Sequence, residues 1–129
     1  MQEQRSVDVI VVGAGNAALV AALAAHEAGA SVLVLEAAPK EQRGGNSRFS
    51  GGIFRFAHGG LDDIRPLLTE EGARWADRVT VEPYQPTRFH ADIDLVCESR
   101  SDPELISTLI DTSYETMAWM RDRGVRWEL

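Results

Sequence analysis

Residues 9–36, VIVVGAGNAALVAALAAHEAGASVLVLE, place two apolar runs on either side of a glycine-rich turn and an alanine-rich segment. The β-branched run at 7–12 predicts a strand buried on both faces of a parallel sheet. Residues 16–28 predict a close-packing helix that Gly29 ends, and residues 31–35 predict a second strand. The order of these elements predicts a βαβ unit with a right-handed crossover.

The turn of this unit carries the sequence GAGNAA, which fits the glycine-rich fingerprint of dinucleotide-binding folds. Gly13 would make the turn from strand to helix, and Gly15 would let the backbone approach a pyrophosphate without a Cβ in the way. Ala18 takes the close-packing position. Asn16 and Ala17 open the helix, so its free N–H groups would point at the phosphates.

An acidic residue, Glu36, closes the second predicted strand. There it is placed to accept hydrogen bonds from both ribose hydroxyls, and its charge would repel a 2′-phosphate, which disfavours an NADP-type ligand. Strand, turn, helix, strand and acid follow in the required order. They predict an adenine-dinucleotide site rather than a purely structural crossover, and they leave NAD and FAD open.

The length, net charge and cysteine content of the sequence limit the class of protein. A chain of 129 residues allows one modest domain with a single core. The net charge of −7 disfavours a broad surface for nucleic acid or anionic lipid. Cys97 is the only cysteine, so no intrachain disulfide or thiol-based metal motif is possible, which suits the cytoplasm. The apolar runs are shorter than a membrane span, so together these features lead us to expect no nucleic acid, no metal and no direct membrane insertion.

A glycine-rich segment without periodicity follows at 37–60 and contains RGGNSRFSGG. It predicts a ligand-facing loop with one helical turn after Gly45, since long structureless segments usually have a function. Paired glycines would let backbone amides approach a flat ring and its phosphates, and Asn46 and Ser47 add short polar groups. An ordinary flexible loop is the alternative.

The rest of the chain is predicted to be mainly helical. Short pieces are predicted at 62–68 and 70–79, an irregular connection at 81–87, an amphipathic helix at 87–100, and a final helix from Asp102, its cap, to Gly124. The residues expected on the apolar faces of the two longer helices are Phe89, Ile93, Val96 and Cys97, then Leu105, Leu109, Met117 and Met120.

The block RGGNSRFSGG after the acid resembles the flavoprotein family of fumarate reductases, succinate dehydrogenases and related dehydrogenases. Members of that family carry a double glycine, a small polar pair and a second double glycine at this place. Residues 35–60 are most similar to tricarballylate dehydrogenase and to the flavoprotein of precorrin-3B synthesis. The resemblance implies an α/β fold: a Rossmann-like FAD-binding βαβ unit, then loop and helices, in an incomplete doubly wound parallel sheet.

The same resemblance implies FAD as the cofactor. Residues 44–47 would contact its pyrophosphate and ribityl chain, and residues 50–52 would run past the isoalloxazine ring. Gly45 stands where membrane-bound succinate dehydrogenases carry a flavin-linked histidine, so the FAD is expected to be non-covalent. The complete set expected to contact the cofactor is Gly13, Gly15, Asn16, Ala17, Ala18, Glu36, Ala37, Gly44, Gly45, Asn46, Ser47, Ser50, Gly51 and Gly52.

The resemblance further implies that residues 1–129 are the amino-terminal part of an FAD-binding domain. The expected activity is hydride transfer from a polycarboxylate to flavin, of the tricarballylate to cis-aconitate type. Its partners would be the remainder of a longer chain and a separate electron acceptor. No catalytic residue is assigned here, because the family's substrate-binding arginine and histidine residues lie in a capping domain beyond position 129, and the isolated chain is expected to be inactive.

Several alternatives stay open. His58 could contact the flavin or a carboxylate substrate, or could be a solvated loop residue. Arg48 and Arg55 could bind carboxylates through their fork geometry, or they could be solvated or pair with phosphate. At the level of function, the alternatives are a flavoprotein of the corrin pathway and a non-catalytic NAD-binding regulatory module.

Overall fold

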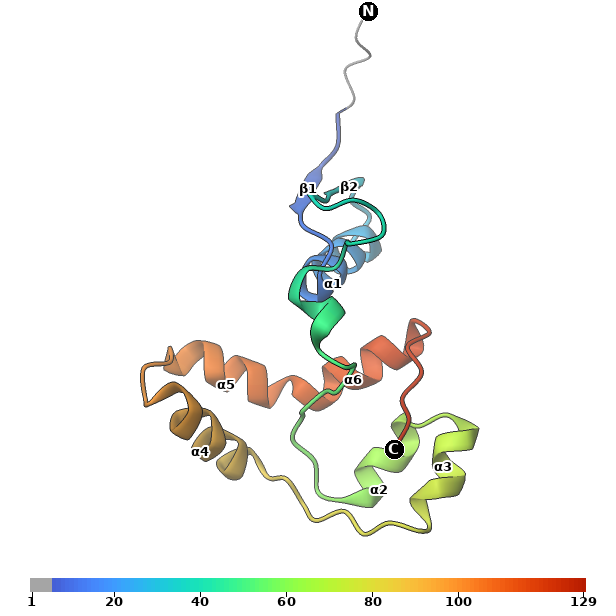
Figure 1. The fold of residues 1–129 in the computed structure, drawn as a ribbon, viewed down its shortest axis with the longest axis vertical. Coiled ribbons are helices and arrows are strands. Elements are labelled where there is room, and N and C mark those ends of the chain that lie inside the picture. The colour runs from blue at the N-terminus through green and yellow to red at the C-terminus, as the bar shows by residue number, and fades with distance from the viewer. Residues whose placement is uncertain (1–5) are drawn as a thin grey trace, which may run out of the picture. The chain divides into compact units, whose positions relative to one another are not determined.

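A computed structural model describes residues 6–129, which divide into two compact units. Unit 1 ends at Ile53 and holds the strands, and unit 2 is Phe54–Leu129 and is mainly helical (Figure 1). All of the buried hydrophobic residues among those described lie in unit 2. The single core expected from the length of the chain is therefore the core of unit 2 alone.

Unit 1 contains the predicted strand, helix and strand. These are β1 (Val9–Val12), α1 (Asn16–Glu27) and β2 (Val32–Leu35), followed by a short 3-10 turn, η1 (Gly45–Phe49). The two strands pair in parallel, and the register runs from Val9 opposite Val32 to Val12 opposite Leu35. The order and pairing of the elements and the helical turn after Gly45 are confirmed, and the result is a mixed α/β unit with a short parallel sheet.

The expectation that the first strand is buried on both faces is wrong. Burial alternates along β1: Val9 and Val11 are half-buried, whereas Ile10 and Val12 are 58% and 83% exposed. Successive side chains of a strand point to opposite faces of the sheet. α1, the one helix described in unit 1 besides the short η1, packs on both strands. A single helix can cover one face of this two-stranded sheet, and the other face stays exposed.

A polar clasp joins the starts of the two strands. The Ser31 N–H and hydroxyl both donate to Asp8 Oδ2, at 2.8 and 2.6 Å, and the Asp8 N–H donates back to Ser31 Oγ at 3.0 Å. The hydroxyl and then the backbone N–H of Ser31 lower the pKa of the Asp8 carboxyl below its ordinary 3.8. An ionised carboxylate accepts these bonds best.

Replacing Asp8 by alanine is expected to lower the melting temperature by a few degrees at neutral pH. The wild-type stabilisation is present above the ordinary pKa of Asp8 and is lost as the pH falls through the lowered pKa of the folded state. The measurement is thermal unfolding between neutral and strongly acidic pH. The exposed Asp94, in the helix α4 (Pro86–Cys97), changed to alanine, is the matched control. Equal melting temperatures for the Asp8→Ala variant and the wild type at neutral pH would contradict the role of the clasp.

Unit 2 is built from short helices. They are α2 (Leu61–Ile64), the 3-10 turn η2 (Arg65–Leu67), α3 (Glu70–Ala76), α4 (Pro86–Cys97), α5 (Pro103–Asp111) and α6 (Ser113–Asp122). Asp102 caps α5 as predicted, because its Oδ1 accepts from the N–H groups of Glu104 and Leu105. Gly124 follows α6 with φ +95°.

The final predicted helix is two helices, α5 and α6, which run on from one another (Figure 1). The break falls at Thr112, whose hydroxyl donates to the Thr108 carbonyl at 2.7 Å. Threonine hydroxyls that bond back to a carbonyl four residues earlier bend helices. Thr108 and Thr116 make the same kind of bond without a break, so the hydroxyl bond alone does not account for the interruption at Thr112, where hydrophobic periodicity predicts continuity.

The apolar face of α5 also differs from the expected one. Leu105 and Leu109 are 69% and 55% exposed, whereas their neighbours Ile106 and Ile110 are buried against Phe89 of α4. On α4, Val96 is 80% exposed. Met117 of α6 is buried, as expected. On α5, the residues that enter the core of unit 2 are therefore each one position later in the sequence than the predicted ones.

Candidate functional site

The fourteen residues predicted to contact a cofactor all belong to unit 1, so their mutual arrangement is set within one compact body. They come from three places: the turn between β1 and α1, the end of β2, and the segment around η1. Hydrogen bonds between these three segments join the glycine turn, the acid and the second glycine block.

The turn begins at Gly13, which has φ +106°, a conformation that L side chains rarely adopt. Its N–H donates to the carbonyl of Leu35 at 2.6 Å, which ties the turn to the end of β2. A Cβ built on Gly13 would lie 4.0 Å from the Cβ of Ala18. Ala18 therefore packs against the turn at ordinary contact distance, as the fingerprint requires of this position.

The space beside Gly15 is taken by the second glycine block. A Cβ added at Gly15 would lie 3.3 Å from the Gly44 carbonyl oxygen and 3.4 Å from Ser47 Oγ. The sequence suggested a role for Gly15 toward a pyrophosphate. In the structure, Gly15 has a second role: because it lacks a side chain, the loop before η1 can approach the start of α1.

The first turn of α1 suits an anion. Its N-cap, Gly15, provides no side-chain acceptor, and no acidic residue lies in the first turn. The Asn16 N–H donates to Ser47 Oγ at 2.9 Å, while the N–H groups of Ala17 and Ala18 have no acceptor within residues 6–129. Unpaired N–H groups and the positive end of the helix dipole attract negative charge.

The carboxylate of Glu36 lies at the glycine turn. Its Oε2 accepts from the Ala14 N–H and its Oε1 from the Ala38 N–H, both at 2.9 Å. The bond from Ala38 is the largest cause that lowers the pKa of Glu36. Desolvation opposes it, and the N–H groups of Ala14 and Gly44 lower the pKa further. The group therefore stays ionised at neutral pH, and each of its oxygens still has a lone pair for a further donor.

Ala14 and Ala38 were not among the predicted site residues. Both act through backbone N–H groups, so their side chains give no chemical signal in the sequence. For Ala14 a signal exists in position alone, because it stands between the two glycines of GAG, in the turn that β2 approaches.

The second glycine block is held as a tight turn. Gly44 and Gly45 have φ of +107° and +52°, and the Ser47 N–H donates to the Gly44 carbonyl at 3.1 Å. The Ser50 hydroxyl donates to the Ser47 carbonyl at 2.9 Å. A Cβ built on Gly45, Gly51 or Gly52 would meet nothing within 4 Å. Open space over backbone with positive φ is a surface that a ligand can approach closely.

Other predicted members of the site are exposed. Asn46 and Ala37 have exposed side chains, and within the described residues the Asn46 amide makes no hydrogen bond to the glycine turn. The guanidinium of Arg48 lies over the ring of Phe49, 5.8 Å from its centroid. These residues flank the hydrogen-bonded centre of the site.

His58 and Arg55 belong to unit 2, where neighbours account for much of their environment. Arg55 pairs with Asp92 at 3.3 Å and with the Tyr84 hydroxyl at 3.2 Å. The backbone of His58 pairs with that of Tyr84, and its buried Nδ1 has no partner within residues 6–129. Burial lowers the pKa of His58, and the charge of Asp63 opposes this effect.

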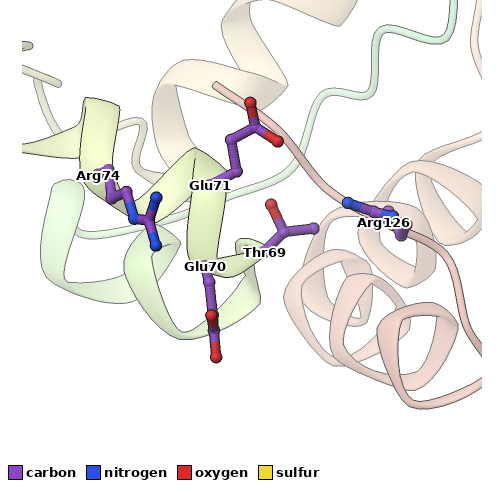
Figure 2. A pocket seen from close by; sticks show the side chains of 5 residues that line it. All are labelled: Thr69, Glu70, Glu71, Arg74 and Arg126. Atoms are coloured by element: carbon purple, nitrogen blue, oxygen red, sulfur yellow. The ribbon is translucent and has the colours of Figure 1, made fainter.

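Unit 2 also holds an open polar pocket, lined by Thr69, Glu70, Glu71, Arg74 and Arg126 (Figure 2). Its two glutamates and Arg74 point in different directions in Figure 2. No predicted cofactor residue lines it, and two carboxylates would oppose a diphosphate. The pocket therefore does not suit a dinucleotide, and the predicted cofactor residues of unit 1 remain the candidate site.

None of the described helices is long and apolar enough to cross a membrane. No group of three or more His, Cys, Asp or Glu side chains within residues 6–129 could hold a metal ion.

The comparison with protein families decides between the dinucleotides. Residues 8–129 match the model of a family described as FAD binding domain. The chain belongs to this FAD binding domain family. This membership identifies FAD as the cofactor. The residues of unit 1 fit such a ligand, since they combine an anion-attracting helix start, an ionised acid and an open glycine backbone.

Curated relatives of this FAD binding domain are oxidoreductases by name. The NADH:fumarate oxidoreductase of Klebsiella pneumoniae (strain 342) is 29% identical over 127 residues, covering 94% of this chain and 11% of the relative. The vinyl phenol reductase of Lactiplantibacillus plantarum is 29% identical over 123 residues, 95% of this chain and 21% of that protein. The 3-oxosteroid 1-dehydrogenase of Mycobacterium tuberculosis (H37Rv) is 32% identical over 114 residues, 88% of this chain and 19% of that protein.

The chain thus spans between 11 and 21% of the length of these relatives. No solved structure matches it.

Proposed function

We propose that this chain is the FAD-binding part of a flavoprotein oxidoreductase and holds the cofactor non-covalently on unit 1. The observation that carries the proposal is the start of α1, where two N–H groups have no acceptor among residues 6–129 and lie beside an ionised glutamate. The free N–H groups of Ala17 and Ala18 would bind the diphosphate. Glu36 would accept hydrogen bonds from the adenosine ribose hydroxyls.

The second glycine block would take the rest of the cofactor. Gly44, Gly45, Asn46 and Ser47 would lie along the diphosphate and ribityl chain, and residues 50–52 would line the isoalloxazine ring. The open space above Gly45, Gly51 and Gly52 supports this assignment. When bound, FAD supplies a hydride acceptor, and the contribution of this chain is to bind and orient it.

Titration of the purified chain with FAD tests the proposal. We expect saturable binding, seen as a change in flavin fluorescence and anisotropy, with weaker binding of NAD. NADP should bind least, because the charge of Glu36 repels its 2′-phosphate. Acid precipitation of the loaded protein should release all of the flavin, since the attachment is non-covalent. Uptake of NAD without uptake of FAD would instead identify an NAD-binding module.

For the complete flavoprotein we propose a polycarboxylate substrate of the tricarballylate type. This proposal is supported by the resemblance of residues 35–60, whereas the relatives carry names with fumarate, vinyl phenol and 3-oxosteroid. Dehydrogenation would remove a hydride and a proton from adjacent carbons to give cis-aconitate. Substrate-dependent bleaching of the flavin absorbance, with tricarballylate compared with succinate and a 3-oxosteroid, would separate these classes.

A further inference from the structure

Residues 57–59 join separate parts of unit 2 through their backbone, and we call this segment the 57–59 junction. The backbone N–H and carbonyl of His58 pair with the backbone of Tyr84, at 3.0 and 2.9 Å. The N–H groups of the residues on either side donate to Ser113 Oγ of α6 and to Asp63 Oδ2 of α2, at 3.0 and 2.6 Å. A displacement of His58 therefore acts on three different parts of the chain.

The imidazole of His58 lies among aromatic rings at this junction. Its ring centroid is 5.2 Å from that of Phe56 and 6.3 Å from that of Tyr84. The ring of Phe89, in the core of unit 2, is 5.2 Å from that of Tyr84. The Nδ1 atom of His58 is buried, and no hydrogen-bond partner for it occurs in the described part of the chain. Packing, and not a bond to Nδ1, therefore holds this side of the imidazole.

These surroundings suit a neutral imidazole and oppose a charged one. A neutral imidazole can carry its one hydrogen on Nε2 and leave Nδ1 as a bare acceptor. Protonation places a hydrogen on Nδ1 as well, so a charged ring would hold a buried donor that has no acceptor. Burial accordingly lowers the pKa of His58 below its ordinary 6.5.

The titratable groups on the elements around the junction do not remove this cost. They are Asp63 of α2, Tyr84 before α4 and Tyr114 of α6. The charge of Asp63 acts on His58, but it raises the pKa of the imidazole by less than burial lowers it. The hydroxyl of Tyr84 donates to Asp92 at 2.7 Å and that of Tyr114 donates to the Asp63 carbonyl at 3.0 Å. Both phenolic hydrogens are therefore bound elsewhere.

We propose that His58 is a pH-sensitive element of unit 2, whose protonation releases the 57–59 junction from Tyr84 and from the two helices that it contacts. The inference goes beyond the proposed function, since the residues expected to contact FAD all lie in unit 1. The junction is closed while His58 is neutral. As the pH falls below 6.5, the open state binds a proton more tightly than the closed state and gains population. This gain ends once the pH lies below the lowered pKa of the closed state.

The test follows unit 2 by its own signals. All three tryptophans, Trp75, Trp119 and Trp127, lie in unit 2, so urea unfolding followed by tryptophan fluorescence reports on that unit. Hydrogen exchange of the amides of residues 57–59 reports on the junction itself. We expect the urea midpoint and the protection factors to fall between about pH 8 and pH 5. The protection factors should fall about tenfold for each pH unit by which the pKa of His58, measured by NMR, lies below 6.5.

Three variants separate the imidazole from the rest of unit 2. His58→Phe keeps an aromatic ring at the junction but cannot take up a proton, so its urea midpoint and protection factors should not show this fall. His90→Gln, on α4 of the same unit, is the matched control and should keep the wild-type fall. Asp63→Asn keeps an acceptor for the junction and removes the opposing charge. The pKa of His58 should therefore lie lower in Asp63→Asn than in the wild type, and the loss of protection should be larger.

An equal fall in the wild type and in His58→Phe, or a measured pKa of His58 at or above 6.5, would overturn the proposal. If His58→Phe does not fold, the NMR titrations of the wild type and Asp63→Asn decide between the outcomes. A lowered pKa that falls further in Asp63→Asn supports the pH-sensitive junction, and an unchanged pKa contradicts it. FAD binding is measured separately by flavin fluorescence, so the proposed function can fail or stand independently of this result.

Discussion

Replacing Gly15 by valine is expected to abolish FAD binding, with a loss of at least about a hundredfold. The reason is contact rather than backbone strain, since Gly15 has φ −77° and ψ 177°, an extended conformation open to any residue. The Cβ alone would lie 3.3 Å from the Gly44 carbonyl oxygen, and the methyl groups of valine would press further against Gly44 and Ser47. The second glycine block would be pushed off the start of α1.

Flavin fluorescence titration measures this effect, and a graded pair of variants sharpens it. Gly15→Ala should lose part of the affinity, because the loop must yield by only a few tenths of an ångström, and Gly15→Val should lose it all. Ala21→Val, at an exposed position of α1, is the control for adding a branched side chain to the same helix. Wild-type affinity in Gly15→Val would show that the cofactor does not use this turn.

Replacing Glu36 by glutamine is expected to weaken FAD binding by about ten- to a hundredfold. Glutamine keeps the size of the side chain but has one acceptor oxygen. Its amide nitrogen would therefore face either the Ala14 or the Ala38 N–H, donor against donor. The variant also loses the negative charge that excludes a 2′-phosphate, so its discrimination between NAD and NADP should narrow.

The pH dependence of binding gives a second measure of Glu36. Hydrogen bonds, of which the one from Ala38 has the largest effect, lower the pKa of Glu36 below its ordinary 4.5. The contribution of the ionised carboxylate to FAD binding is therefore complete above pH 4.5. It is lost as the pH falls through the lowered pKa. Wild-type affinity for FAD should therefore hold from neutral pH to about 4.5 and then decline, whereas Glu36→Gln should lack this decline. Parallel profiles for the two proteins would remove Glu36 from the site.

The strand, helix and strand of unit 1 could be predicted because each depends on neighbours in sequence. A β-branched run, an alanine-rich segment and Gly29 favour their conformations locally, and the structure begins and ends these elements within two residues of the predicted bounds. The same holds for Asp102, whose side chain caps the helix that starts at the next residue. The prediction of FAD rather than NAD as the cofactor depended on the second glycine block.

Packing could not be predicted in the same way. On α5, Leu105 with Leu109 and Ile106 with Ile110 are both apolar pairs four residues apart, so periodicity alone gives two equal faces. Phe89 of α4 lies against the isoleucines, and this contact between distant segments buries one pair and exposes the other. The break at Thr112, where φ is −96° and ψ is −1°, is likewise not indicated by hydrophobic spacing.

By itself, the sequence determined that this chain has a glycine turn between a strand and a helix, with an acid closing the next strand, because those features depend on residues close together in the chain. The tertiary structure alone decided that the Glu36 carboxylate accepts the Ala14 N–H and that Ser47 accepts the Asn16 N–H. Both bonds join residues more than twenty positions apart. Their partners are fixed by how β2 pairs with β1 and how η1 folds back over α1, which no local pattern specifies.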